Sequence, residues 1–118
     1  MPELISEPTM IPVPGGKSIA EYVGRVKTGD DDVSIAVIHA PAGWSEPEQT
    51  PAFDEFTIVI TGSIDVEHDG KTTTVGAGQA IITRAGETVR YLTREDAHYV
   101  AVCLPAFSPD LVNRDDES

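Results

Sequence analysis

Hydrophobic residues along this chain alternate with polar ones or run in short blocks, and no segment has the periodicity of a long amphipathic helix. Glycine and proline interrupt the blocks about every eight to twelve residues, a spacing typical of all-β sandwiches and barrels. The blocks predicted to form strands are "SIAEYVGRV", "DVSIAVIHA", "EFTIVITG", "SIDVEHDG", "KTTTV", "QAIITR", "TVRYLT" and "HYVAVCL". The pattern therefore predicts an all-β fold built from short strands.

The turns and the ends of the chain agree with this interpretation. Asp69 and Gly70 lie between two of the blocks and predict a tight hairpin, because glycine readily takes the positive φ that such a turn requires. Residues 1–16 hold four prolines and a Gly-Gly pair, and they predict an extended N-terminal arm. We assign residues 17–107 to the β-domain and residues 108–118 to a short acidic C-terminal tail, either irregular or a single helical turn.

The block at residues 55–60 is apolar on both of its faces. Successive side chains of a strand point to opposite sides, so one face carries Phe56, Ile58 and Ile60 and the other carries Glu55, Thr57 and Val59. A strand buried on both faces needs a second sheet on one side and further cover on the other. We expect the N-terminal arm or a second copy of the chain to supply that cover, and therefore a homodimer.

The composition limits which kinds of partner the protein is expected to bind and in which compartment it is expected to reside. The 118 residues suffice for about one domain, and 20 acidic against 8 basic residues give a net charge of -12. This charge repels phosphate backbones and anionic lipid, so we expect no nucleic-acid and no membrane partner. Cys103 is the single cysteine, which fits a reducing compartment. No segment has the pattern of a signal peptide or a membrane span, and the sequence predicts a cytoplasmic protein.

Two glycine-spaced frames carry the candidate chemistry. The first consists of Gly43, Gln49, Pro51, Glu55 and Gly62, and the second of Gly78, Arg84, Gly86, Val89 and Thr93. Their spacing resembles the two motifs of the cupin superfamily, GxxxxxHxHxxxExxxxxxG and GxxxxxPxGxxHxxxN. The resemblance spans about residues 33–107 and implies a single cupin-type β-barrel or jelly roll with two antiparallel sheets. The glycines and the glutamate match, whereas the three histidine positions hold Gln49, Pro51 and Val89.

Within the superfamily, a longer stretch is similar to the ethanolamine-utilisation cupins of the protein Q type. It reads "DEFTIVITGSIDVEHDGKTTTVGAGQAIITRAGETVRY" and is followed by "YVAVCLPAF". Members of that group also lack the histidines of the ordinary metal site. The resemblance therefore implies a cupin that departs from metal chemistry.

A typical cupin holds Mn, Fe, Ni or Zn with three imidazoles and one carboxylate. Of those ligand positions this chain keeps Glu55 and the weak amide oxygen of Gln49, because proline and valine side chains have no lone pair to donate. We therefore expect no cofactor. The alternative is a divalent metal on the unusual ligand set Glu55, Gln49 and His98, in which His98 comes from the last strand and shares the parity of Val100 and Val102.

Without a metal, Glu55 is the candidate catalytic or anchoring group. A carboxylate inside an apolar barrel loses hydration, which raises its pKa toward the range useful for proton transfer. We expect the same pocket to be bordered by Gln49, Thr57, Val89, Tyr91 and His98. The competing interpretation is that hydrogen bonds or an arginine, either Arg84 or Arg90, hold Glu55 and give it a structural role without chemistry.

Two aromatic residues and one arginine complete the candidate ligand-binding set. Trp44 lies in the loop "AGWSEPE" and Phe53 lies just before the motif glutamate, and they form either an aromatic wall for a small organic ligand or a lid packed on the barrel rim. Arg84 either meets an anionic ligand or pairs with a surface carboxylate.

The sequence leaves three functions open, and with them the question of enzymatic activity. The first is metal-independent binding or conversion of a small polar metabolite. The second is a metalloenzyme with the unusual ligand set. The third is a non-catalytic dimeric accessory module, as the ethanolamine-utilisation resemblance implies through association with protein shells.

Overall fold

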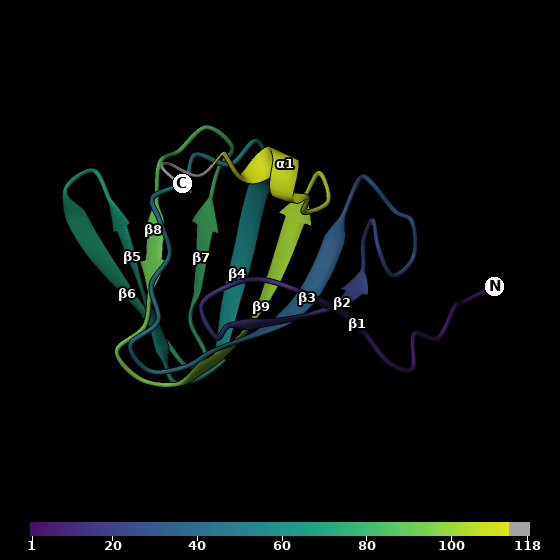
Figure 1. The fold of residues 1–118 in the computed structure, drawn as a ribbon, viewed down its shortest axis with the longest axis horizontal. Helices are drawn as coiled ribbons and strands as arrows, with labels where there is room; N and C mark the ends of the chain where they lie inside the picture. The colour runs from purple at the N-terminus through teal and green to yellow at the C-terminus, as the bar shows by residue number, and fades with distance from the viewer. Residues whose placement is uncertain (114–118) are drawn as a thin grey trace.

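A computed structural model of the protein describes residues 1–113, and it confirms the all-β prediction. Two antiparallel sheets face each other and form the jelly-roll barrel of Figure 1. The larger sheet has the strand order β1 (Thr9–Ile11), β2 (Ser18–Val23), β3 (Ser34–Ala40), β9 (Ala97–Leu104), β4 (Asp54–Thr61) and β7 (Ala80–Thr83). The smaller sheet has the order β6 (Lys71–Gly76), β5 (Ser63–His68) and β8 (Arg90–Leu92).

Strand β4 alternates between the interior and the surface as its sequence predicts. Thr57 and Val59 are buried, with exposed fractions of 1% and 0%, whereas Ile58 and Ile60 are 44% and 54% exposed. The main core lies between the sheets on this inner face. The alternation also places Glu55 on the inner face, next to the core.

The predicted hairpin is confirmed between β5 and β6. Asp69 and Gly70 have φ values of 50° and 72°, and the register pairs His68 with Lys71 on either side of them. A two-residue turn with both φ values positive matches the right-handed twist of the flanking strands.

Segments near both ends of the described chain pack on the barrel, whereas the first eight residues extend away from it (Figure 1). The predicted arm contains β1, which pairs with β2 at the edge of the larger sheet. After β9 the chain forms one helical turn, α1 (Pro109–Val112), and Val112 is buried against Phe53 and Cys103. The rest of the predicted acidic tail, residues 114–118, lies outside the described residues. None of the helices within residues 1–113 has the length and apolar character to cross a membrane.

The loop between β3 and β4 behaves as an additional edge of the smaller sheet. Gln49 and Val89 exchange two backbone hydrogen bonds of 2.9 Å, and Ser45 forms a bridge with Leu92. This pairing gives the loop a strand-like alternation, so that Glu46 is buried while Ser45 is exposed. The loop can therefore place polar side chains inside the barrel.

Gly62 connects β4 to β5 and cannot accept a side chain. Its φ is +77°, and a Cβ atom there would lie 2.0 Å from the carbonyl oxygen of Asp96. We expect Gly62→Ala to destabilise the fold by about 3 kcal/mol or more, because conformational strain and a backbone clash add. Urea unfolding midpoints measure the change.

Gly78→Ala is the matched control for this prediction. Gly78 also has a positive φ, +81°, but no atom lies within 4 Å of the position of its Cβ. That variant carries only the left-handed strain of about 1–2 kcal/mol. If Gly62→Ala and Gly78→Ala destabilised the protein equally, the proposed clash with the Asp96 carbonyl oxygen would be refuted.

Candidate functional site

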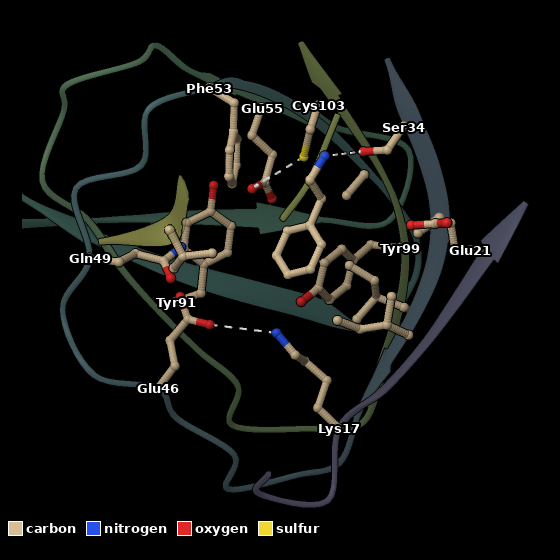
Figure 2. Close-up of a pocket in the computed structure, with 16 residues that line it drawn as sticks. Lys17, Glu21, Ser34, Glu46, Gln49, Phe53, Glu55, Tyr91, Tyr99 and Cys103 are labelled. Carbon is tan, nitrogen blue, oxygen red and sulfur yellow. Dashed lines mark hydrogen bonds and ion pairs between the residues drawn. The ribbon is translucent and has the colours of Figure 1, made fainter. Parts of the chain in front are cut away.

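A cavity of about 50 Å³ lies inside the barrel, and its wall combines carboxylates with aromatic rings. Figure 2 shows these side chains converging from both sheets, from the loop before β4 and from the segment that follows β9. The polar and aromatic groups at the wall include Lys17, Glu21, Ser34, Glu46, Gln49, Phe53, Glu55, Tyr91, Tyr99, Cys103 and Phe107.

Glu55 projects from β4 into this cavity. Its Oε2 accepts a hydrogen bond of 3.2 Å from the Thr57 hydroxyl, and the Cys103 thiol donates to its Oε1 over 4.0 Å. The expectation that an arginine pairs with Glu55 is wrong. Arg84 pairs with Asp54 at 3.5 Å, and Arg90 pairs with Glu67 at 2.8 Å.

The environment of Glu55 favours its neutral form. Burial, and secondly the charge of Glu46, raise the pKa of Glu55 to about 7, although the charge of Lys17 and the Thr57 hydrogen bond oppose the rise. A carboxyl group with this pKa is present in both protonation states near neutral pH. It can therefore accept or donate a proton under physiological conditions.

Lys17 and Glu46 form a buried ion pair at the opposite side of the cavity. Their charged atoms are 3.5 Å apart, and both side chains are less than a tenth exposed. The Lys17 ammonium also lies 4.5 Å from the centre of the Trp44 ring, a cation–π distance. Sequence reasoning missed both charged residues. The alternating pattern of "GWSEPEQ" was a signal for Glu46, but no local pattern marks Lys17.

Two tyrosines face the cavity with different partners. The Tyr91 hydroxyl hydrogen-bonds to the Thr83 hydroxyl at 2.9 Å. The Tyr99 hydroxyl points into the cavity (Figure 2) and forms no hydrogen bond with any described residue, although Tyr99 is only 1% exposed. Burial, and secondly the charge of Glu55, raise the pKa values of both hydroxyls. Tyr99 was not a sequence candidate.

His98 does not border the cavity, so its predicted place beside Glu55 is wrong. It is exposed on the outer face of the larger sheet, where its ring stacks on His39 with a centroid distance of 4.4 Å. The inner face of β9 instead carries Ala97, Tyr99, Ala101 and Cys103. His98 does lie on the same face of β9 as Val100 and Val102, but this is the outer face of the sheet. The unusual ligand set thus loses its only histidine.

The structure brings together some of the other candidates and separates the rest. Gln49, Phe53 and Tyr91 line the cavity with Glu55, and Phe53 contacts Phe107 edge to face at 6.1 Å. Thr57 and Val89 are also buried, but their side chains do not line the cavity. Two candidates lie elsewhere. Arg84 is an exposed residue over the Phe56 ring, and Trp44 packs into the core beside Lys17.

Glu21 also lines the cavity, but its carboxylate has a structural role. Its Oε2 accepts hydrogen bonds of 2.9 Å from the backbone N–H groups of Val26 and Lys27. A Cβ atom at Gly24 would lie 2.7 Å from the same carboxylate. Glu21 therefore fixes the turn that leaves β2.

Comparison with known sequences identifies the family to which this barrel belongs. The profile of the cupin domain matches residues 36–104, more than half of the chain. The chain belongs to the cupin family. A curated relative of this cupin is the endoribonuclease YbeY of Myxococcus xanthus (strain DK1622), with 41% identity over 108 residues. The match covers 88% of this chain but only 36% of that protein, so the cupin spans about a third of its relative's length.

Solved cupin structures share the fold at low sequence identity. Ethanolamine utilization protein Q from Salmonella typhimurium LT2 is 20% identical, with a TM-score of 0.67 over 77% of this chain and 71% of that one. The polyketide cyclase RemF from Streptomyces resistomycificus is 18% identical, with a TM-score of 0.78 over 100% and 87%. An RmlC-like cupin from Shewanella frigidimarina NCIMB 400 is 14% identical, with a TM-score of 0.76 over 93% and 94%. This is a small cupin that resembles the protein Q type.

The donors in this barrel do not fit the metal centre of a typical cupin. Pro51 and Val89 occupy two histidine positions without a lone pair, and Gln49 offers an amide at the third. Within residues 1–113 no group of three or more histidine, cysteine, aspartate or glutamate side chains is arranged to hold a metal ion. Burial, and secondly the charge of Glu55, raise the pKa of the Cys103 thiol, which disfavours the thiolate that binds metals.

The raised pKa of Glu55 makes the stability of the fold depend on pH. The folded state holds this proton more tightly than the unfolded state, so stability falls as the pH rises from about 4.5 to about 7. The shift corresponds to a loss on the order of 3 kcal/mol. Glu55→Gln should remove this loss. The variant should match the wild type near pH 4.5 and exceed it in unfolding free energy above pH 7.

Urea unfolding of both proteins across this pH range tests the prediction. A constant difference between wild type and variant at every pH would show that the pKa of Glu55 is not raised by folding.

Proposed function

We propose that this cupin binds a small polar metabolite in its barrel without a metal ion, and that Glu55 acts as the anchor or as the acid and base of the site. The observation that carries the proposal is the Glu55 carboxyl group, which faces an internal cavity and has a pKa of about 7. Perturbed carboxyl groups in cavities are enriched at functional sites. Cupins of the same fold that are named after small-molecule chemistry, such as the polyketide cyclase, support the ligand class.

Metal independence is part of the proposal and follows from ligand counting. Of the residues at the usual ligand positions, only the Glu55 carboxylate and the Gln49 amide carry donor atoms. A tightly bound transition metal needs more donors than two oxygens, of which one is a neutral amide.

The name of the Myxococcus relative supports no proposal of RNA cleavage for this chain. The similarity covers 36% of that protein, so the named activity belongs to a polypeptide that is mostly absent here. This chain also has a net charge of -12, which opposes contact with a phosphate backbone.

A ligand screen by NMR tests the proposed function. Small polar compounds of diverse charge are added to the wild type, to Glu55→Gln and to the control variant His98→Gln on the outer face. We expect binding by at least one class of compound to the wild type and to His98→Gln, and its loss by about tenfold or more in folded Glu55→Gln.

Metal analysis of the same samples completes the experiment, and we expect less than stoichiometric transition metal. One equivalent of Mn, Fe, Ni or Zn that is lost in Glu55→Gln would overturn metal independence. Retained binding in Glu55→Gln would overturn the role of Glu55.

We further infer that the chain forms a homodimer through the outer face of the larger sheet. Five large apolar side chains on this face have exposed fractions between 37% and 54%: Ile35, Val37, Ile58, Ile60 and Ile82. They lie on β3, β4 and β7, on the face opposite the cavity, and the half-buried Val100 and Val102 of β9 join β3 to β4 on that face. Contiguous exposed apolar surface of this kind is typical of interfaces between proteins.

Light scattering after size exclusion tests the dimer at micromolar concentration. We expect the wild type to elute as a dimer and Ile60→Glu to shift toward the monomer, because a carboxylate in the interface loses hydration without a partner. The control is Thr72→Glu on the exposed strand β6, which should leave the mass unchanged. A monomeric wild type would refute the interface.

A further inference from the structure

The charges that line the cavity are unbalanced. Three carboxylates, Glu21, Glu46 and Glu55, line it, and Lys17 is the single basic residue among the described residues at its wall. The Lys17 ammonium is committed to Glu46 at 3.5 Å, and the Glu21 carboxylate is held by two backbone N–H groups. Glu55 forms none of the ion pairs found within residues 1–113, and the charge of Lys17, which lowers its pKa, is outweighed by burial and by the charge of Glu46.

A second group points at the same space. Tyr99 is a buried residue whose hydroxyl is directed into the cavity and forms no hydrogen bond with another described residue. A hydroxyl that faces a cavity offers its oxygen as an acceptor to a ligand that donates a hydrogen bond. Glu55 and Tyr99 line the same small cavity, so one small ligand there lies next to both residues.

The remaining wall suits a cation. Phe53 and Phe107 meet edge to face at 6.1 Å beside Glu55, and Tyr91 and Tyr99 contribute two further rings. The faces of aromatic rings attract cations electrostatically, most strongly where water is excluded. An anion would face the charge of Glu55, and the net charge of -12 repels anions at longer range.

We propose that the site binds a small primary alkylammonium ion, whose N–H groups donate hydrogen bonds to the Glu55 carboxylate and to the Tyr99 hydroxyl oxygen while its carbon atoms contact the aromatic rings. The proposal rests on the proposed function of this cavity and adds the chemical class of the ligand. The cavity of about 50 Å³ limits the size. Because a cavity of about 150 Å³ accepts benzene, this one has room for roughly two to four non-hydrogen atoms.

The test compares isosteric probes of different charge. Methylammonium and ethylammonium are titrated against ethanol and acetate at physiological ionic strength, and the NMR signals of the aromatic rings at the cavity are followed. We expect the ammonium ions to bind with dissociation constants no tighter than about a millimolar, given their few atoms. The neutral and anionic probes should bind at least about tenfold more weakly.

The dependence on pH gives an independent readout. Only the ionised form of Glu55 attracts the cation, and the pKa of this group is about 7. The affinity for ethylammonium should therefore fall about tenfold between about pH 8 and about pH 6.

Three variants assign the binding to residues. Glu55→Gln should abolish ethylammonium binding, and Tyr99→Phe should weaken it by about three- to tenfold while the pH dependence is kept. Glu48→Gln removes the same charge from an exposed side chain outside the cavity and should bind as the wild type does. Thermal unfolding confirms that each variant is folded.

The possible results separate this inference from the proposed function. Acetate or ethanol that binds through Glu55 more tightly than ethylammonium would overturn the ligand class and leave the proposed function intact. Equal losses in Glu55→Gln and Glu48→Gln would show binding to the acidic surface and also overturn the ligand class. If neither these probes nor the wider screen perturb the cavity signals, both proposals fail.

Discussion

The alternation of side chains along β4 and β9 is the constraint on which the rest of the structure depends. These two strands pair at the centre of the larger sheet, from Asp54 opposite Leu104 to Thr61 opposite His98. Because the period is two, the pairing sends Glu55 and Tyr99 to the cavity and Ile58 and His98 to the surface in a single step. A shift of either strand by one residue would exchange the site for the apolar outer face. The register is therefore what joins the core, the cavity and the candidate interface into one arrangement.

The same arrangement buries the Glu55 carboxyl group, and burial destabilises its ionised form. The cost at Glu55 is a considerable part of the 5–15 kcal/mol by which domains of this kind are stable. The barrel compensates with a continuous apolar core between its sheets and a smaller cluster of Phe53, Cys103 and Val112 beside the carboxyl. Buried titratable groups with perturbed pKa values are enriched at functional sites, so the destabilising position of Glu55 supports a functional role for it.

The altered motif changes the kind of chemistry that the barrel supports. Histidine positions that would supply lone pairs to a metal hold a proline and a valine, and Gln49 pairs its backbone with Val89 at the edge of the site. What remains is a carboxyl, two tyrosine hydroxyls and an enclosed ion pair, Lys17–Glu46. Such groups act by hydrogen bonding, charge and proton transfer, which is the basis of the metal-independent proposal.

The sequence by itself determined the all-β class, the Asp69-Gly70 hairpin and the two faces of β4, because turn chemistry and a period of two are local properties. Its motif spacing also located Glu55 and Gln49 in one pocket, and the parity of Tyr91 with Val89 along their strand added Tyr91. It misplaced His98, because parity says which residues share a face but not which face is inside. Only the tertiary structure decided that β9 turns Tyr99 inward, that Lys17 reaches Glu46 from a segment distant in sequence, and that Arg84 and Arg90 pair away from Glu55. Those contacts depend on how the sheets close on each other, and no local pattern encodes that closure.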